Sequence, residues 1–154
     1  MVAFRLNGRD VDVDVPGDEP LLYVLADDLK MNGVKYGCGK SQCGACHVLI
    51  DGVSVASCQT SVSAAAGTRV TTLEGLRDPD GSPSLLQQAF IDEQAAQCGF
   101  CLNGVILTAK AFLDRNPGAS DAEIRQALSG VLCRCFANVR MIRAIGRYAR
   151  GAAV

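Results

Sequence analysis

Short runs of alternating apolar and polar residues open the chain, and a period of two is that of a β-strand with one buried face. Val2, Phe4 and Leu6 occupy alternate positions, Asn7-Gly8 follows, and the alternation resumes over residues 11–15. An Asn-Gly pair between two alternating runs favours a two-residue hairpin turn. We therefore expect the chain to begin with a β-hairpin.

The rest of the first 76 residues mixes helix and strand patterns. Leucines recur at helical spacing over residues 21–29, which predicts one helix packed on a sheet. Asp51-Gly52 separates residues 47–50 from residues 53–57 and predicts a second hairpin. Residues 68–73 are rich in β-branched side chains and predict another strand.

A change of period marks a second domain. The segment from Arg77 to Gly81 combines proline, glycine and charge, as connectors between domains do. Strand-like alternation stops before this segment, and helical spacing begins after it. The predicted architecture is an α+β domain of residues 1–76 followed by an all-α domain of residues 82–154.

The second domain is predicted to contain four helices. Ser82 is placed to cap the first helix, with Pro83 at its first position and an end near Gln94. Ser120 and Glu123 form a capping-box pair at the start of the third. Apolar spacing predicts the second and fourth helices over residues 102–113 and 139–149.

Composition argues against several functions. Fifteen Lys and Arg against sixteen Asp and Glu give a net charge of −1 without a basic block, so no nucleic acid partner is expected. The longest apolar runs fall far short of the roughly 20 residues of a membrane span, so no transmembrane segment is expected. The first residues lack the pattern of a signal peptide. We expect a cytoplasmic protein, with export as a folded complex with a signal-bearing partner left open.

Eight cysteines are the unusual feature of the composition. Disulfides are rare in a reducing compartment, so thiolate ligation of metal is favoured over a disulfide framework. The first set runs Cys38-x4-Cys43-x2-Cys46 and then Cys58, which is the spacing of a plant-type ferredoxin 2Fe-2S site. Three ligands from one loop require a tightly bent backbone, which the neighbouring glycines permit.

The second set consists of two pairs, Cys98-x2-Cys101 and Cys133-x-Cys135, which precede the second and fourth predicted helices. Helix N-termini present free N–H groups and positive dipole ends, which stabilise an anionic tetrathiolate cluster. A structural zinc site uses the same ligand type, although a single residue between two ligands is tighter than the usual zinc pairing. The residues alone leave a zinc-stabilised interaction module and a freestanding ferredoxin with a helical tail as alternatives to a two-cluster redox protein.

His47 is the sole histidine and directly follows Cys46. A Rieske centre requires two histidines on one iron. We therefore interpret His47 as a hydrogen-bonded strand residue and not as a ligand.

Three motifs carry a resemblance to a known family. They are G-C-G-K-S-Q-C-G-A-C from Gly37 to Cys46, Q-C-G-F-C from Gln97 to Cys101 and L-C-R-C from Leu132 to Cys135. They resemble the small 2Fe-2S subunit of the xanthine oxidase, or molybdenum hydroxylase, family. Within it, the lack of a flavin domain and the segments 23–29 and 86–97 look most similar to the small subunits of isoquinoline 1-oxidoreductase and nicotinate dehydrogenase.

The resemblance implies a plant-type ferredoxin-like (β-grasp) domain followed by a four-helix 2Fe-2S domain. It implies an electron-transfer subunit of a molybdenum-dependent oxidoreductase, with no catalytic residue of its own. Gln97 and Cys135 would contact the pterin of a molybdopterin cofactor bound by a large partner subunit. Electrons would pass from there through an inner and an outer cluster to a cytochrome, a quinone or a flavin subunit. The implied ligands are Cys98, Cys101, Cys133 and Cys135 for the inner cluster and Cys38, Cys43, Cys46 and Cys58 for the outer one.

The chain departs from the family pattern at two places. Leu102-Asn103 stands where the family often has Thr-Pro, and Phe136-Ala137-Asn138 stands where Thr-Gly-Tyr or Gly-Thr-Tyr is common. The cysteines themselves are unaffected. The departures concern the packing beside the pterin and the potential of the inner cluster, which hydrogen bonds and exposure tune.

Overall fold

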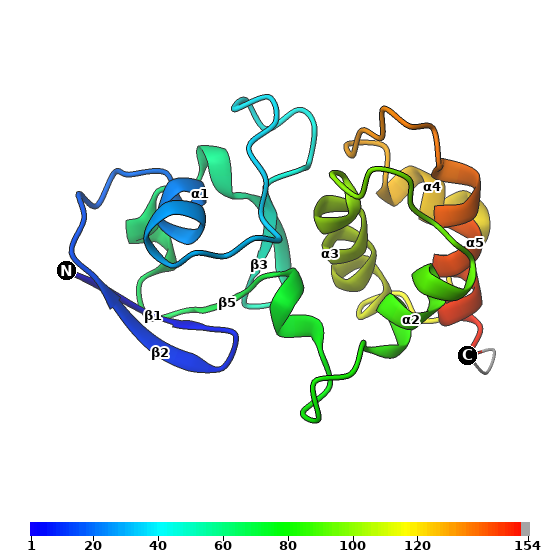
Figure 1. Cartoon of the computed structure of the whole chain (residues 1–154), viewed down its shortest axis with the longest axis horizontal. Coiled ribbons are helices and arrows are strands. Elements are labelled where there is room, and N and C mark those ends of the chain that lie inside the picture. Colours follow the sequence, from blue (N-terminus) through cyan, green and yellow to red (C-terminus); the bar gives the residue numbers. More distant parts are fainter. Residues whose placement is uncertain (152–154) are drawn as a thin grey trace.

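The computed structural model describes residues 1–151 and consists of a sheet domain and a helical domain that lie side by side (Figure 1). The green connector joins them at one side, and helix α3, Leu102–Leu113, faces strand β3, His47–Ile50. An α+β half followed by a helical half is what the change of period predicted.

The sheet has five strands in the order β2-β1-β5-β3-β4. Strands β1 and β5 are parallel, and the other neighbours are antiparallel. Both predicted hairpins are confirmed, because Asn7-Gly8 and Asp51-Gly52 all have positive φ, as a type I′ turn requires. The strands other than β3 are β1 Val2–Leu6, β2 Arg9–Val13, β4 Val53–Ala56 and β5 Arg69–Thr71.

The helix predicted over residues 21–29 is present in an irregular form. Helix α1, Leu21–Tyr23, continues as a π-helical turn, Val24–Asp28, and its leucines are buried against the sheet. Single π-helical turns are uncommon and often accompany functional sites. The remaining helical turns of this domain are the 3-10 segments Ser57–Gln59, Val62–Ala65 and Leu73–Leu76.

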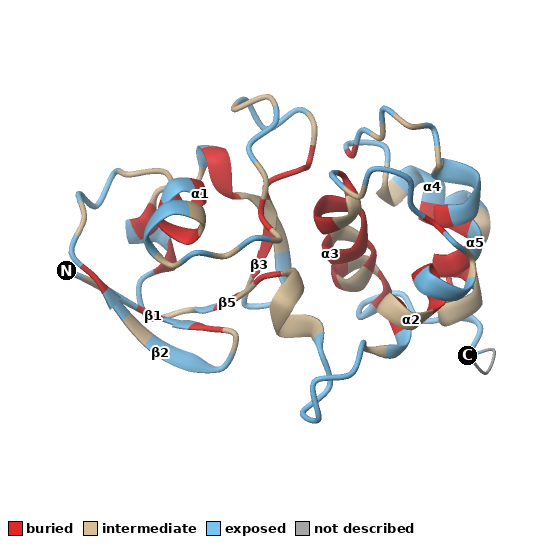
Figure 2. Ribbon diagram, viewed as in Figure 1, coloured by how far each residue is buried: buried red, intermediate tan, exposed pale blue. Residues whose placement is uncertain are grey.

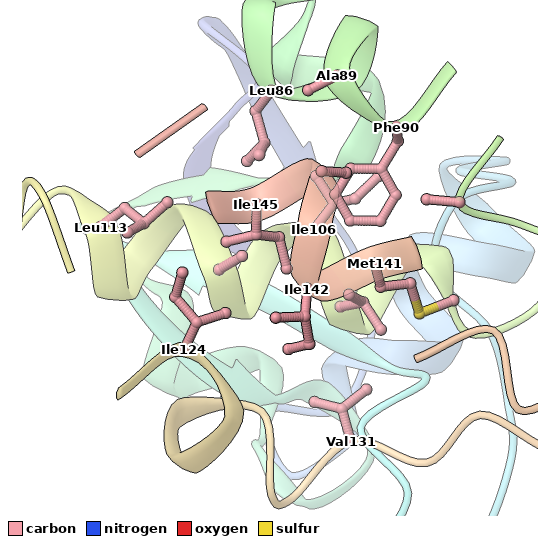
Figure 3. Close-up of a cluster of buried hydrophobic side chains, with 14 of the residues drawn as sticks. Leu86, Ala89, Phe90, Ile106, Leu113, Ile124, Val131, Met141, Ile142 and Ile145 are labelled. Carbon is pink, nitrogen blue, oxygen red and sulfur yellow. The ribbon is translucent and has the colours of Figure 1, made fainter. Parts of the chain in front are cut away.

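The helical domain packs its four helices around one apolar core (Figure 3). Leu86 and Phe90 point into this core from α2, Ile106 from α3, Ile124 from α4 and Ile145 from α5. Helix α4, the third helix of this domain, begins with the predicted capping box, in which the Ser120 side chain accepts a hydrogen bond from Glu123 N. The helices other than α3 are α2 Leu85–Asp92, α4 Asp121–Ala127 and α5 Asn138–Ala149.

The predicted start of α2 is wrong by two residues. Ser84 caps the helix and forms a reciprocal capping box with Gln87. The hydroxyl of Ser82 instead donates to Asp80 Oδ1 at 2.6 Å, within the connector. The helix also ends at Asp92, and Gln94 adopts φ 47°. Two serines flank Pro83, and only the complete Ser-x-x-Gln pattern identifies the one that acts as the cap.

The two domains contact each other directly along α3. Leu49 of β3 and Leu107 of α3 form a small buried cluster between the domains, and Figure 2 shows most of α3 as buried. The backbones approach so closely at one point that a Cβ on Gly104 would lie 2.2 Å from the carbonyl oxygen of Gly44. The cysteine loop of the first domain is therefore held against the start of α3.

Within residues 1–151, no helix combines the length and apolarity needed to cross a membrane.

Candidate metal centres

The loop that carries Cys38, Cys43 and Cys46 directs backbone N–H groups at thiol sulfurs. Lys40 N and Gln42 N donate to Cys38 Sγ at 3.3 and 3.2 Å, and Cys38 N donates to Cys43 Sγ at 3.4 Å. Such N–H donors stabilise thiolates and tune the potential of iron–sulfur centres. The loop thus has the donor arrangement of a cluster-binding loop.

Glycine is required at one position of this loop by direct contact. A Cβ on Gly37 would lie 2.6 Å from Cys43 Sγ, so a larger residue would displace the sulfur. Cys58 approaches the loop from the turn after β4, where the neighbouring Ser57 hydroxyl donates to the Cys46 carbonyl at 2.6 Å. The four cysteines of the first set therefore come from one loop and one adjacent turn, as the sequence predicts.

The thiols of the first set differ in their acidity. N–H groups of Lys40 and Gln42 lower the pKa of Cys38 to about 7. Burial, together with the neighbouring Cys58 thiol, raises the pKa of Cys46 to about 11. Ligation deprotonates such a buried thiol in any case, because the metal charge dominates its surroundings. The N–H donors thus favour the thiolate form of Cys38, which is the form that binds metal.

The second set is brought together from two helix starts. Cys101 is the N-cap residue of α3, and Cys133 and Cys135 lie on the segment that leads into α5. Burial and the Cys133 thiol raise the pKa of Cys101 to about 12. The N–H of Phe100 and the Cys135 thiol lower the pKa of Cys98. All four thiols of this set therefore lie close enough to influence one another.

Two neighbouring hollows divide the second set. Cys98, Cys101 and Cys133 line one of about 560 Å³. Cys135 lines the other, of about 420 Å³, together with Gln97. The structure thus places the two residues predicted to contact a pterin in one hollow, beside the hollow that holds the other three cysteines.

Several large apolar side chains are exposed around the second set. Phe136 is 79% exposed. Its backbone adopts a left-handed conformation, with a φ of 56°. Arginines line the same hollows. Exposed aromatic residues mixed with arginine are typical of protein–protein interfaces. The further members of this face are Phe100, Leu132, Val139, Arg134, Arg140 and Arg143.

The histidine of β3 is hydrogen-bonded, as predicted. His47 Nδ1 lies 2.9 Å from Thr108 Oγ1 of α3 and 3.1 Å from Ser54 Oγ of β4. Burial lowers the pKa of His47, so the ring is neutral at pH 7.

Across residues 1–151, no three cysteine, histidine or acidic side chains converge in the manner of a single-ion site.

Sequence reasoning missed Asn103, which reaches from the start of α3 to the cysteine loop. Its side chain is 1% exposed, and Nδ2 donates to the carbonyls of Ala45 and His47 at 2.9 and 2.8 Å. The departure from the family's Cys-Thr-Pro-Gly pattern marked this position, but only the fold reveals its partners. Cys43 O also accepts from Leu132 N at 3.0 Å, which ties the same loop to the segment before Cys133.

Comparison with known families identifies the class of protein. Residues 4–72 match a family described as a 2Fe-2S iron-sulfur cluster binding domain. Residues 72–146 match a second family, described as a [2Fe-2S] binding domain. The chain is therefore an iron–sulfur protein with two 2Fe-2S-binding domains, which rules out both the zinc module and the single-cluster ferredoxin.

Relatives narrow this class to one family. The chain is 53% identical to one of the subunits of nicotinate dehydrogenase from Pseudomonas putida, covering 96% of this chain and 94% of the relative. It is 47% identical to the alpha subunit of isoquinoline 1-oxidoreductase from Brevundimonas diminuta, and the match covers 99% of this chain and 100% of the relative. The chain belongs to the small iron–sulfur subunits of the xanthine oxidase, or molybdenum hydroxylase, family, and the resemblance seen in its motifs is confirmed.

Solved structures agree with this assignment. Quinoline 2-oxidoreductase from Pseudomonas putida 86 contains a chain with a TM-score of 0.87 and 34% identity, covering 99% of this chain and 97% of that one. Aldehyde oxidoreductase from Desulfovibrio desulfuricans has a TM-score of 0.90 and 38% identity over 97% of this chain. This chain spans only 17% of that second protein.

Proposed function

We propose that this chain relays electrons from a molybdenum centre on a large partner subunit, through two 2Fe-2S clusters, to an external acceptor. The observation that carries the proposal is the hydrogen bond from Leu132 N to Cys43 O at 3.0 Å. It joins Cys43 of the first set to Leu132, whose next residue is Cys133 of the second set. The two sets are therefore directly connected within one chain.

We propose the ligands that the sequence indicates. The N–H groups around Cys38, the glycine packed on Cys43 Sγ and the clustered thiols near the start of α3 all suit anionic thiolate clusters. When bound, each 2Fe-2S cluster takes up and releases one electron at a time. The ligands would be Cys38, Cys43, Cys46 and Cys58 for the outer cluster and Cys98, Cys101, Cys133 and Cys135 for the inner one.

Electrons would enter at the inner set. Gln97 and Cys135 share a hollow at the surface, where they would contact the pterin of a molybdopterin cofactor held by the partner. The apolar and arginine-rich face around them would be covered by that partner, which excludes water from the transfer site. The protein supplies position and hydrogen bonding here, and the cofactors supply the redox chemistry.

Electrons would leave at the outer set. The loop from Gly39 to Gln42 lies at the surface beside Cys38, so an acceptor can approach this ligand from solvent. A cytochrome, a quinone or a flavin subunit would each serve as a one-electron acceptor.

We also propose residues 1–76 as a ferredoxin-like, β-grasp domain and residues 82–154 as a four-helix domain, on the sheet order and helix bounds given above.

The order of transfer is tested by rapid-freeze EPR on the complex with its large subunit. Substrate would be sought first among nicotinate and isoquinoline, which two relatives carry in their names. In a Cys43→Ser variant, substrate should still reduce the remaining cluster in a single turnover, while steady-state transfer to the acceptor collapses. Normal reduction of the outer cluster in a Cys133→Ser variant would show that the proposed order is wrong.

A further inference from the structure

Asn103 forms a second tie between the two cysteine sets. It follows Cys101 by two residues in the first turn of α3, and both hydrogens of its amide are used on the other domain. They bind the carbonyls of Ala45 and His47, which lie on either side of Cys46. One buried side chain beside Cys101, an inner candidate ligand, thus binds the backbone just before and just after Cys46, an outer candidate ligand.

The orientation of this amide is fixed by its partners. Rotation by 180° would place Oδ1 against two carbonyl oxygens, which repel it, so only the observed orientation is stable. In that orientation Asn103 Oδ1 is buried and has no hydrogen-bond partner among the described residues. An unpartnered buried acceptor destabilises a fold and calls for an explanation.

Contact between the two domains does not by itself explain why a polar residue is buried at position 103. Apolar side chains such as Leu49 and Leu107 and the close approach of Gly44 to Gly104 already hold the domains together. Hydrogen bonds between Thr108 and His47 and from Leu132 N to Cys43 O add to this contact. An apolar side chain at residue 103 would extend that contact without an orphan oxygen. A buried polar residue in an apolar contact instead fixes one register between the surfaces, as buried asparagines do between helices.

We propose that Asn103 is a positioning residue that fixes the distance and relative orientation of the two clusters. The bond from Leu132 N to Cys43 O attaches the cysteine loop at one point. The Asn103 bonds to Ala45 and His47 attach it again on both sides of Cys46, and two separate polar attachments restrict rotation between the ligand segments more than one does. This inference rests on the proposed two-cluster relay, because an orientation between clusters has meaning only if both are present.

The test is the magnetic coupling between the clusters in the complex with the large subunit, reduced fully with dithionite. Two nearby reduced clusters split each other's EPR lines, and the splitting depends on their separation and orientation. We expect Asn103→Leu to keep about four irons per chain and both signals, as two 2Fe-2S clusters require, but to lose or at least halve the splitting. Asn103→Ala, which leaves room for water on the freed carbonyls, should give the same result if the leucine variant does not fold.

A matched control is Thr108→Val, which removes the bond from the same helix to the His47 ring and leaves the Asn103 bonds to the Ala45 and His47 carbonyls in place. This variant should keep the wild-type splitting. Wild-type splitting in an Asn103 variant with full iron content would overturn the proposal. Loss of a cluster in both Asn103 variants would also overturn it, because Asn103 would then be needed only for cluster assembly. A wild-type protein with one cluster would instead contradict the proposed function itself.

Discussion

At the residue scale, one strained backbone conformation lies directly beside a candidate ligand. Phe136 follows Cys135, adopts φ 56° and exposes most of its ring. A left-handed conformation costs a non-glycine residue about 1–2 kcal/mol. Strained residues cluster at functional sites, where their surroundings or partners hold them in place. The ring contributes little to folding and is well placed to contact a partner.

Replacing Phe136 with glycine should therefore separate folding from association. Relief of the left-handed strain offsets the roughly 0.5–1 kcal/mol that glycine loses in backbone entropy, so stability should not fall. Binding to the large subunit should weaken by about tenfold or more, as for a buried aromatic anchor. Denaturant unfolding and a titration of the two subunits measure both quantities.

Lys30→Gly is the control for Phe136→Gly, because Lys30 has a similar φ of 55°. It should relieve the same strain and leave association unchanged. Unaltered affinity in the phenylalanine variant would remove this face from the interface.

Glu74 gives a second prediction at this scale. Burial acts to raise the pKa of Glu74, but hydrogen bonds from the Thr72 hydroxyl and from backbone N–H groups, including that of Gly33, outweigh it and lower the pKa. A carboxylate with a lowered pKa stabilises the fold above its ordinary value of 4.5, and this contribution is lost as pH falls through the folded value. Glu74→Gln should cost about 1 kcal/mol at pH 7, after allowance for partial exposure.

The pH dependence distinguishes this effect from a simple packing defect. The difference in unfolding free energy between wild type and Glu74→Gln should stay constant from pH 7 to just above 4.5 and shrink as pH falls below 4.5. Asp18→Asn, at an exposed carboxylate of the same domain, is the control and should change the unfolding free energy little at pH 7. A gap in unfolding free energy that stays unchanged below pH 4.5 for the Glu74 variant would mean that the charge contributes nothing.

At the scale of elements, the closest backbone contact makes the clearest prediction. Gly104→Ala would improve helix propensity by about 1 kcal/mol, yet its Cβ would collide with the Gly44 carbonyl at 2.2 Å. A backbone carbonyl between two ligands cannot move freely, so the variant should lose about 1–3 kcal/mol of stability. Gly130→Ala, where no atom lies within 4 Å of a new Cβ, should be neutral. Equal stability of the two variants, measured by denaturant unfolding, would contradict the contact.

Elements with strong local signals could be predicted from the sequence. The two hairpins follow from Asn7-Gly8 and Asp51-Gly52, whose conformations are set by the turn itself. The start of α2 was misplaced because Ser82 and Ser84 offer competing caps, and the π-helical turn after Tyr23 carries no signal that we recognised. Local chemistry determines the first kind of feature, and packing determines the second.

The same division applies to the site. The cysteine spacing indicates the candidate ligands because the cysteines occur in local groups, three in one loop of the first set and two close pairs in the second. The contacts of Asn103 and Glu74 were not predicted because their partners lie far away along the chain, at His47 for Asn103 and at Gly33 for Glu74. A contact of this kind leaves no periodic or local pattern.

At the scale of the whole molecule, the proposed domain division predicts partial independence. A fragment of residues 1–76 retains its own core, including Phe4, Leu25 and Val48, but exposes Leu49 and lacks Asn103. It should bind one 2Fe-2S cluster with lower stability than the full chain. Iron analysis and EPR of the reconstituted fragment decide this. If the fragment binds no cluster while the full chain binds two, the domains are not independent.

The most direct test of the account is to remove one ligand from each set in the complete complex. Wild type should contain about four irons and four sulfides per chain and give two EPR signals on reduction with dithionite. Cys43→Ser should abolish one signal, Cys133→Ser the other, and each should lower the iron content by about half. Loss of the same signal in both variants, or zinc in place of half the iron, would contradict two separate clusters held by these cysteines.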